Sequence, residues 1–201
     1  MRISYSIAHE WWSGNQDNAI AMLSSEPVYH PLALEKAFSF GQGVHKAMEL
    51  EAQATGKLPA IFKLPDFDVI ATEQKLTKEL PSGDVLSGIL DVVAINPKNG
   101  MIMLGDYKSS NSFDELQACV YQYLITDHPW WKEHIGDLKP THAFFMTLDK
   151  KADFKAQNHI IHLTHPKTPE EWAAPDATTY TRGGNWIMTC ITEIKEVLEI
   201  A

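Results

Sequence analysis

Residues 85–108 read VLSGILDVVAINPKNGMIMLGDYK, and this stretch decides the predicted fold. Two apolar runs, 85–95 and 101–108, flank the segment Asn96–Gly100, whose sequence NPKNG is typical of a tight turn. We therefore predict a β-hairpin. Because the two strands of a hairpin lie side by side, Asp91 of the first run and Asp106 of the second are expected to come together.

The residues of this hairpin suit metal-assisted cleavage of a phosphodiester bond. Asp106 and Lys108 are two positions apart, and alternate residues of a strand point to the same face. Carboxylates bind Mg²⁺ or Mn²⁺ through hard oxygen ligands, and an ammonium can orient water or offset charge on the phosphate. Asp91 and Asp106 both follow apolar runs, where an unused buried charge is costly. The simpler interpretation is an ordinary ion pair on a solvated hairpin.

Helices and strands are predicted on both sides of the hairpin. Residues 1–31 are predicted to be irregular, and the stretch 168–185 is the best candidate for a loop. The predicted order is helix 32–54, strands 67–76, 85–95 and 101–110, helix 113–128, strands 141–149 and 159–165, and helix 186–201. This order predicts a mixed α/β fold.

Composition limits the class of protein. The chain has 201 residues, of which 44% are hydrophobic and 21% charged, as in a globular domain. No run approaches the roughly 20 apolar residues of a membrane span, and no signal peptide is evident, so a cytoplasmic protein is expected. Cys119 and Cys190 cannot form a four-cysteine metal site. A net charge of −9 with only two arginines, Arg2 and Arg182, disfavours sequence-specific recognition of DNA bases.

Five short motifs, taken in chain order, resemble those of the RecB-like branch of the PD-(D/E)xK nuclease superfamily. They are G-x-x-x-H (Gly41–His45), a strand glutamate (Glu73), G-x-x-D (Gly88–Asp91), D-Y-K-S (Asp106–Ser109) and Q-x-x-x-Y (Gln117–Tyr121). The opening ISYS also resembles the start of many such nucleases. The resemblance implies a restriction-endonuclease-like α/β core, with a central mixed sheet flanked by helices. It also implies one nuclease domain over 1–201, with its catalytic core at 32–165 and a loop and helix at 166–201.

The resemblance implies a role for each matched residue. Asp91 and Asp106 would be the central metal ligands, and Lys108 would be the catalytic lysine. His45 and the main-chain carbonyl of Tyr107 would complete the ligand set for Mg²⁺ or Mn²⁺. Glu73 would be one of the catalytic acids, either as a supporting residue or as a ligand of a second ion. The remaining matches, which would contact DNA, are Ser109, Gln117 and Tyr121. Surface exposure or simple packing is the alternative explanation for His45, Glu73, Gln117 and Tyr121.

The expected activity is that of a metal-dependent deoxyribonuclease, most simply an exonuclease in DNA recombination or repair. The arrangement resembles phage or prophage exonucleases of the RecE type, which implies DNA as substrate, a homo-oligomer, and a single-strand annealing or recombination protein as partner. The two cysteines do not match the positions that hold an iron–sulfur cluster in some relatives, so no cluster is expected. The alternative is a nuclease fold that has lost its activity and serves in DNA binding or assembly.

Two further features have competing interpretations. His159, His162 and His165 form an H-x-x-H-x-x-H run, but the apolar residues between them favour a strand, which would point His162 away from the other two. A zinc site, and with it a zinc hydrolase, is therefore disfavoured. The tryptophan pairs 11–12 and 130–131 could stack on single-stranded bases, although anchoring of a core edge is the more common use.

Overall fold

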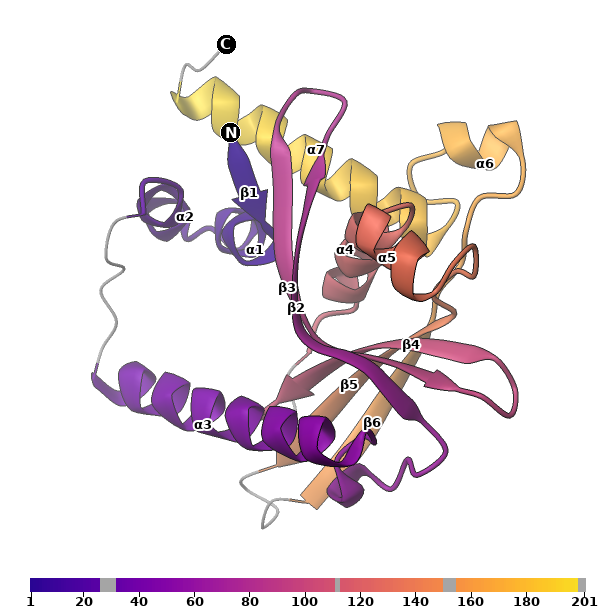
Figure 1. Cartoon of the computed structure of the whole chain (residues 1–201). Helices are drawn as coiled ribbons and strands as arrows, with labels where there is room; N and C mark the ends of the chain where they lie inside the picture. The colour runs from indigo at the N-terminus through magenta and orange to yellow at the C-terminus, as the bar shows by residue number, and fades with distance from the viewer. Residues whose placement is uncertain (26–31, 111–112, 150–154, 199–201) are drawn as a thin grey trace.

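One six-stranded mixed sheet forms the centre of the protein in the computed structural model, which describes residues 1–25, 32–110, 113–149 and 155–198 (Figure 1). The strands are β1 (Arg2–Ser4), β2 (Asp68–Glu79), β3 (Val85–Asn96), β4 (Met101–Lys108), β5 (His142–Asp149) and β6 (Lys155–His162). Their order is β1-β3-β4-β5-β6, and β2 pairs with the other edge of β3. The β1–β3 and β4–β5 pairs are parallel, and the others are antiparallel. A mixed sheet flanked by helices is what the sequence predicted.

The predicted hairpin is confirmed by β3 and β4. Its turn closes through a hydrogen bond from the Gly100 N–H to the Asn96 carbonyl at 2.8 Å. Gly100 has a φ of 71°, a left-handed conformation that glycine adopts without strain. Gly105 lets the strands pack closely, because a Cβ there would lie 2.4 Å from Cγ1 of Val92. The turn residues and the small residue in β4 thus set the register that aligns Asp91 with Asp106.

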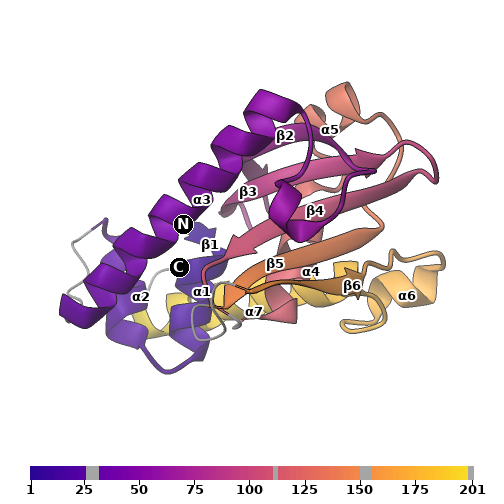
Figure 2. The same ribbon diagram turned by 90° about the horizontal axis from the view of Figure 1, so that it is seen from below.

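Helices cover both faces of the sheet (Figures 1 and 2). One face carries the long helix α3 (Leu32–Thr55) and the short 3₁₀ helix η1 (Ala60–Phe62). The other face carries α1 (Tyr5–Trp12), α4 (Glu115–Ile125) and α7 (Thr179–Leu198), and the smaller helices are α2 (Gln16–Leu23), α5 (Pro129–His134) and α6 (Pro169–Ala173). Each face has its own apolar cluster, around Leu90 and Leu124 on the α4 side and around Phe62 and Tyr107 on the α3 side. Among the described residues, no helix combines the length and apolar character needed to cross a membrane.

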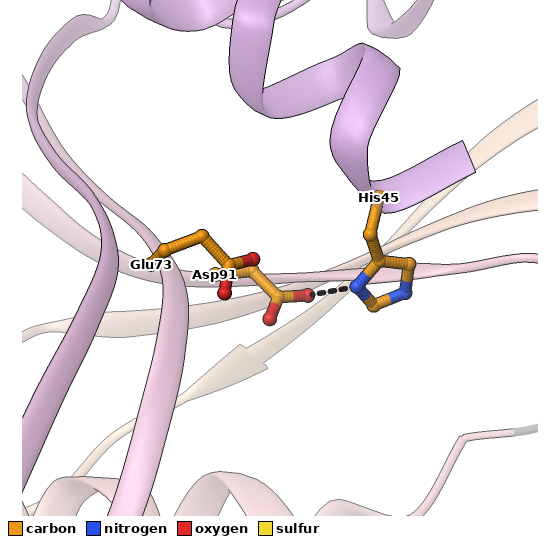
Figure 3. Close-up of side chains that lie close together, drawn as sticks. All are labelled: His45, Glu73 and Asp91. Carbon is orange, nitrogen blue, oxygen red and sulfur yellow. Dashed lines mark ion pairs between the residues drawn. The ribbon is translucent and has the colours of Figure 1, made fainter. Parts of the chain in front are cut away.

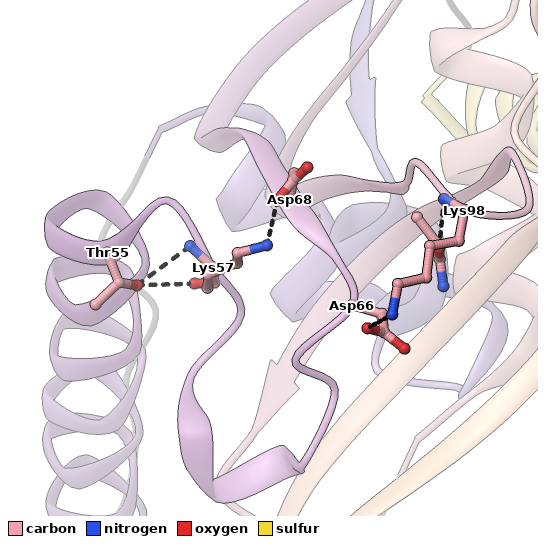
Figure 4. A network of polar contacts seen from close by, with 6 residues as sticks. Thr55, Lys57, Asp66, Asp68 and Lys98 are labelled. Atoms are coloured by element: carbon pink, nitrogen blue, oxygen red, sulfur yellow. Dashed lines mark hydrogen bonds and ion pairs between the residues drawn. The ribbon is translucent and has the colours of Figure 1, made fainter.

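Polar contacts fix the end of α3 against the start of β2 (Figure 4). The hydroxyl oxygen of Thr55 accepts a hydrogen bond from the Lys57 N–H at 3.2 Å, and the ammonium of Lys57 pairs with Asp68. Nearby, Lys98 of the hairpin turn pairs with Asp66 at 2.6 Å. All these side chains are exposed or half-buried, so each ion pair contributes little stability by itself. They connect the end of α3 to the first residue of β2, and the segment before β2 to the hairpin turn.

The N-terminal segment departs from the prediction. Residues 1–31 were expected to be irregular, but β1, α1 and α2 occupy most of the described part, and residues 26–31 lie outside it. The hydroxyl of Ser4 caps α1 by accepting a hydrogen bond from the Ile7 N–H at 3.3 Å. Ile7 and Trp11 are buried in the core cluster. The apolar spacing of an eight-residue helix is too short to stand out among the polar residues around it.

The C-terminal half also departs from the predicted boundaries. The last strand is Lys155–His162 rather than 159–165. The helix predicted over 113–128 is the shorter α4, and a separate helix, α5, begins after it at Pro129. The predicted loop 168–185 contains α6 and the first turns of α7. Gly183 falls in this predicted loop but lies within α7, where a Cβ would come 2.2 Å from the carbonyl oxygen of Cys119 in α4. Close helix packing explains this glycine.

Candidate active site

The site lies where the sheet forks around β3. Strand β1 pairs with β3 from Val85 to Ser87, and β4 pairs with the same edge from Val92 onward. Between them, residues 88–91 have no strand partner on that edge among the described strands. Asp91 fills the gap, because its Oδ2 accepts a hydrogen bond from the Tyr107 N–H at 2.8 Å. Where the pairing of β3 with β4 ends, this carboxylate therefore accepts the N–H that a backbone carbonyl of the neighbouring strand would otherwise accept.

Glu73 approaches Asp91 from β2. It lies between the register pairs Thr72–Val92 and Gln74–Leu90, so it is beside Asp91 in the sheet. Its φ of 48° is in the left-handed region, which costs a residue with a side chain about 1 kcal/mol or more. Backbone strain of this kind persists only where the surrounding structure enforces it. The left-handed backbone at Glu73 is therefore enforced by the packing around β2.

His45 reaches the same point from α3 (Figure 3). Its Nδ1 lies 3.3 Å from Oδ2 of Asp91, and ligand atoms of His45, Glu73 and Asp91 all lie within 4.8 Å of one another. The ring of Tyr107 packs edge-on against the imidazole, with ring centroids 6.3 Å apart, and stacks on Phe62 on its other side. Three separate elements, α3, β2 and β3, therefore bring one imidazole and two carboxylates together.

A second set of contacts holds Asp106 and Lys108. The Lys108 ammonium lies 2.7 Å from Oδ2 of Asp106 and donates to Oε1 of Gln117 at 3.0 Å. The amide nitrogen of Gln117 donates to Oδ1 of Asp106 at 2.9 Å and to the Tyr121 hydroxyl at 3.0 Å. Gln117 is buried, with 6% of its surface exposed. Helix α4 therefore fixes both the lysine and the carboxylate through one amide side chain.

Burial dominates the electrostatics of these groups. It raises the pKa of Asp91 well above its usual value, and the neighbouring Asp106 raises it further. Burial also raises the pKa of Asp106, although Lys108 opposes the shift. The pKa of His45 is lowered by burial, so its imidazole favours the neutral form that can bind a metal. Two buried carboxylates that repel each other are stabilised by a cation placed between them.

The donor set fits a divalent metal ion. Asp91, Asp106 and Glu73 supply hard oxygen atoms, which Mg²⁺ and Mn²⁺ prefer, and His45 supplies one nitrogen. Oδ2 of Asp106 is buried and has no hydrogen-bond donor among the described residues, beyond its ion pair with Lys108. The buried carboxylates, the neutral imidazole and this acceptor are all suited to a bound cation.

Three clefts open from the site, and Lys108 lines all of them. The first, of about 770 Å³, is lined by residues of β2 and β3 and includes the carboxylates, Lys75 and Arg2. We call it the β-ribbon cleft. The α1 cleft, of about 1140 Å³, includes Tyr5 and Arg182, and the α3 cleft, of about 840 Å³, includes Lys46 and Ser109. Of the three, the β-ribbon cleft is the one that Asp91 and Asp106 line, and Glu73 lines both this cleft and the α3 cleft.

The structure brings most of the sequence-predicted site residues together. His45, Glu73, Asp91, Asp106, Lys108 and Gln117 line the β-ribbon cleft, and Tyr121 joins them. Tyr107 lies beneath them with its ring buried, and Ser109 lies in the α3 cleft instead. Gln117 is enclosed by Asp106, Lys108 and Tyr121, so the geometry makes it a residue that positions its neighbours.

Sequence reasoning missed a contact made by Tyr5. Its hydroxyl donates a hydrogen bond of 2.7 Å to Oδ2 of Asp114, the residue that caps α4. This bond joins α1 to the helix that carries Gln117, and burial together with this bond raises the pKa of Tyr5. The motif ISYS contains Tyr5, but nothing in the sequence alone pairs it with a residue so far along the chain.

The C-terminal histidines do not form a metal site. His159 packs against the ring of Phe113 with centroids 4.4 Å apart, and His162 packs against His142 at 4.5 Å. His165 follows the end of β6, and its Nε2 lies 3.2 Å from the carbonyl oxygen of Pro140. The predicted strand over all three histidines is therefore wrong, because β6 ends at His162.

The tryptophan pairs divide between core and surface. Trp11 and Trp131 are buried, and their indole N–H groups donate to Oε2 of Glu193 at 3.1 Å and to the carbonyl of Leu138 at 2.6 Å. Trp12 is 59% exposed. Anchoring of the core explains one member of each pair.

Comparisons with known proteins give limited similarity. No protein-family model matches the chain, and no curated protein matches it in sequence. Among solved structures, an alkaline exonuclease (LHK-Exo) from Laribacter hongkongensis aligns over 98% of this chain and 92% of its own, with 11% identity and a TM-score of 0.46. LHK-Exo in complex with dAMP aligns over 97% and 90%, with 14% identity and a TM-score of 0.42. Because these values are low, the chemistry of this chain has to be inferred from its own residues.

Proposed function

We propose that this protein is a metal-dependent deoxyribonuclease that hydrolyses DNA phosphodiester bonds, acting as an exonuclease in recombination or repair. The observation that carries the proposal is the convergence of His45, Glu73 and Asp91 from three elements, with ligand atoms within 4.8 Å of one another. Asp106 and Lys108 extend this cluster along the neighbouring strand. Such a set of buried acids beside an ammonium, open to three clefts, suits the cleavage of an anionic polymer.

The residues that would hold the ion are Asp91, Asp106, His45 and the main-chain carbonyl of Tyr107, with Glu73 beside them. When bound, Mg²⁺ or Mn²⁺ would polarise the phosphate and acidify the attacking water. His45 approaches Asp91 from α3, with its Nδ1 3.3 Å from Oδ2 of Asp91, so both residues would be available to hold the ion. The Tyr107 N–H holds Oδ2 of Asp91, which fixes the rotamer of that carboxylate before any ligand arrives.

Lys108 would contact the substrate directly. Its ammonium is held between Asp106 and Gln117, so the side chain is ordered before a phosphate enters the cleft. From this position it can orient a water molecule or offset charge that develops on the phosphate oxygens. Gln117 would hold the lysine and the carboxylate at a fixed separation, and Tyr121 would in turn support the amide. Order in the site therefore comes from α4.

The alternative, an inactive nuclease fold used for binding or assembly, is disfavoured. A degenerate site would be expected to lose at least one of the acids or the lysine, and all of them are present and close together. Buried acids with raised pKa values also cost stability, which favours a functional reason for keeping them. We further propose, on the family resemblance alone, that the chain forms a homo-oligomer and works with a single-strand annealing or recombination protein.

Substrate topology tests the proposal. Purified protein should degrade linear duplex DNA in Mg²⁺ or Mn²⁺ and leave a closed circle of the same sequence intact, and EDTA should stop the reaction. Equal cleavage of the circle would replace the exonuclease assignment with an endonuclease. Binding to DNA without cleavage in either metal would favour the inactive alternative.

A further inference from the structure

We propose that one strand of the substrate leaves the carboxylate cluster along the β-ribbon cleft, where Lys75 and Arg2 bind successive backbone phosphates. This inference rests on the proposed nuclease function and adds a path for the strand. The cleft is lined by the acids, by Lys75 of β2 and by Arg2 of β1. The ligand class is a single polynucleotide strand.

The register of the strands sets out this path. On β3, Ile89 and Ser87 precede Asp91 at alternate positions, which point to one face of a strand. Lys75 pairs with Ile89 and Thr77 pairs with Ser87, while Ser87 also pairs with Ser4 of β1. A continuous row of side chains therefore runs from the carboxylates through Lys75 to Thr77, and beside it lies Ser87, whose hydroxyl already donates to the Ile3 carbonyl at 3.2 Å. Lysine and hydroxyl side chains are common phosphate contacts.

The charges favour this cleft over the other two. Apart from the site residues Glu73, Asp91 and Asp106, no acidic side chain lines it within the described chain. Neither Lys75 nor Arg2 forms an ion pair with any described residue, so both charges are available to a ligand. The other two clefts are also lined by acidic side chains that do not belong to the carboxylate cluster.

In the α1 cleft, Arg182 shares the walls with Glu10, Asp114 and Glu115, which would repel a phosphate backbone. The α3 cleft shares Lys75 with the β-ribbon cleft, but it lacks Arg2, and its own Lys46 is already paired with Glu49 at 2.6 Å. A polyanion is therefore favoured in the β-ribbon cleft.

The cleft also offers an apolar surface to the nucleotides. Ile89 is 41% exposed although it lies in the middle of β3, directly opposite Lys75. A nucleotide strand carries apolar sugar and base faces beside its phosphates, so an exposed isoleucine between a lysine and hydroxyl groups suits it. His128 at the same wall is already satisfied, because its ring nitrogens contact the Trp130 N–H and the Thr77 carbonyl, each at 3.1 Å. It is therefore not counted as a phosphate ligand.

Binding without catalysis tests the path. Fluorescence anisotropy with a labelled single-stranded oligonucleotide in EDTA should show about fivefold weaker binding for Lys75→Ala and for Arg2→Ala. The double variant should lose roughly the product of the two factors, and the slope of log K against log salt should fall by about 0.7 per lost contact. Lys167→Ala is the matched control, because Lys167 is exposed and lines none of the three clefts.

Replacing single phosphates of the oligonucleotide with uncharged groups locates the phosphate that Lys75 contacts. One methylphosphonate placed at successive positions should weaken wild-type binding most at the phosphate that Lys75 contacts, and the same substitution should cost Lys75→Ala almost nothing. Equal sensitivity of both proteins at every position would overturn the proposal. So would a loss of binding in Arg182→Ala with Lys75→Ala and Arg2→Ala unaffected, because the strand would then lie in the α1 cleft.

Cleavage assays separate this inference from the proposed function. Lys75→Ala should raise KM about fivefold in Mg²⁺ with little change in kcat, since the lysine contacts the strand away from the reacting bond. Wild-type cleavage with no effect of either substitution on binding or KM would overturn the path and leave the nuclease intact. Absence of wild-type cleavage, with the anisotropy losses as predicted, would overturn the nuclease and leave a strand-binding cleft.

Discussion

At the scale of single residues, two partners fix the position of the Lys108 side chain. It is paired with Asp106 and donates to Gln117, so its ammonium is fixed where the three clefts meet. Asp-x-Lys and Gln-x-x-x-Tyr could both be found in the sequence, but their connection through one amide could not. That connection depends on the packing of α4 against β4, which is a tertiary contact.

Replacement of the lysine separates catalysis from metal binding. Lys108→Ala should lower the cleavage rate by about 10²-fold or more, because the ammonium acts on water and phosphate. Its affinity for Mn²⁺, measured by calorimetry, should stay within a few fold of wild type. Lys46→Ala serves as the control, since Lys46 is exposed and already paired with Glu49. Wild-type rates for Lys108→Ala would mean that the site is misassigned.

Removal of one buried carboxylate charge should stabilise the metal-free protein. Asp91→Asn keeps an acceptor for the Tyr107 N–H and ends the repulsion with Asp106, so we expect a gain of about 1 kcal/mol at neutral pH. Thermal unfolding in EDTA measures this gain. Added Mn²⁺ should raise Tm for the wild type and leave that of the variant almost unchanged. A variant less stable than wild type in EDTA would show that the two charges do not oppose each other.

Helix α4 is the element that orders the site, and it is held by α7. Gly183 of α7 lies against the α4 backbone, so Gly183→Ala forces the helices apart and should destabilise the protein by about 2 kcal/mol. Cleavage should fall as well, because Gln117 moves with α4. Gly43→Ala in α3 is the matched control: a Cβ there meets nothing within 4 Å, and alanine should stabilise the helix by about 0.5–1 kcal/mol. Urea unfolding of both variants measures the difference.

The predictability of the elements follows from the length of their patterns. Helix α3 and strands β3 and β4 carry long apolar runs or clear turn residues, and they were found close to their true limits. Helices α1 and α2 are eight residues each, too short for their periodicity to be distinguished from a loop. The loop predicted over 168–185 overlaps the start of α7, where the role of Gly183 depends on its contact with Cys119, outside its own segment. The fork beside Asp91 was missed for the same reason, since it depends on β1.

Asp84 connects distant parts of the whole molecule. Its buried carboxylate pairs with the amino terminus at 2.7 Å and with Lys195 of α7 at 2.9 Å, and accepts from Ser82 at 2.6 Å. Burial raises the pKa of Asp84, but these hydrogen bonds outweigh it and lower the pKa from 3.8 to about 2. The start of β1, the β2–β3 turn and the C-terminal helix are thus held at one point.

This junction predicts a pH dependence of stability. A carboxylate whose pKa is lowered on folding stabilises the protein above its unfolded pKa, and this stability is lost as the pH falls through the folded value. Asp84 should therefore contribute about 2 kcal/mol at neutral pH, lost between about pH 4 and pH 2. In urea unfolding at a series of pH values, Asp84→Asn should be less stable at pH 7 and lose less stability on acidification. An unchanged acid slope would exclude this role.

The most direct measurement of the central claim is phosphodiester hydrolysis by wild type and Asp91→Asn, prepared identically and compared in Mg²⁺ and in EDTA. The substrate is one linear duplex carrying a different label at each end, and products are resolved by length. We expect progressive shortening by the wild type in Mg²⁺ but not in EDTA, and a loss of at least about 10²-fold in the variant. Hydrolysis that persists in EDTA, or that proceeds equally in Asp91→Asn, would contradict a metal-dependent site built on this carboxylate.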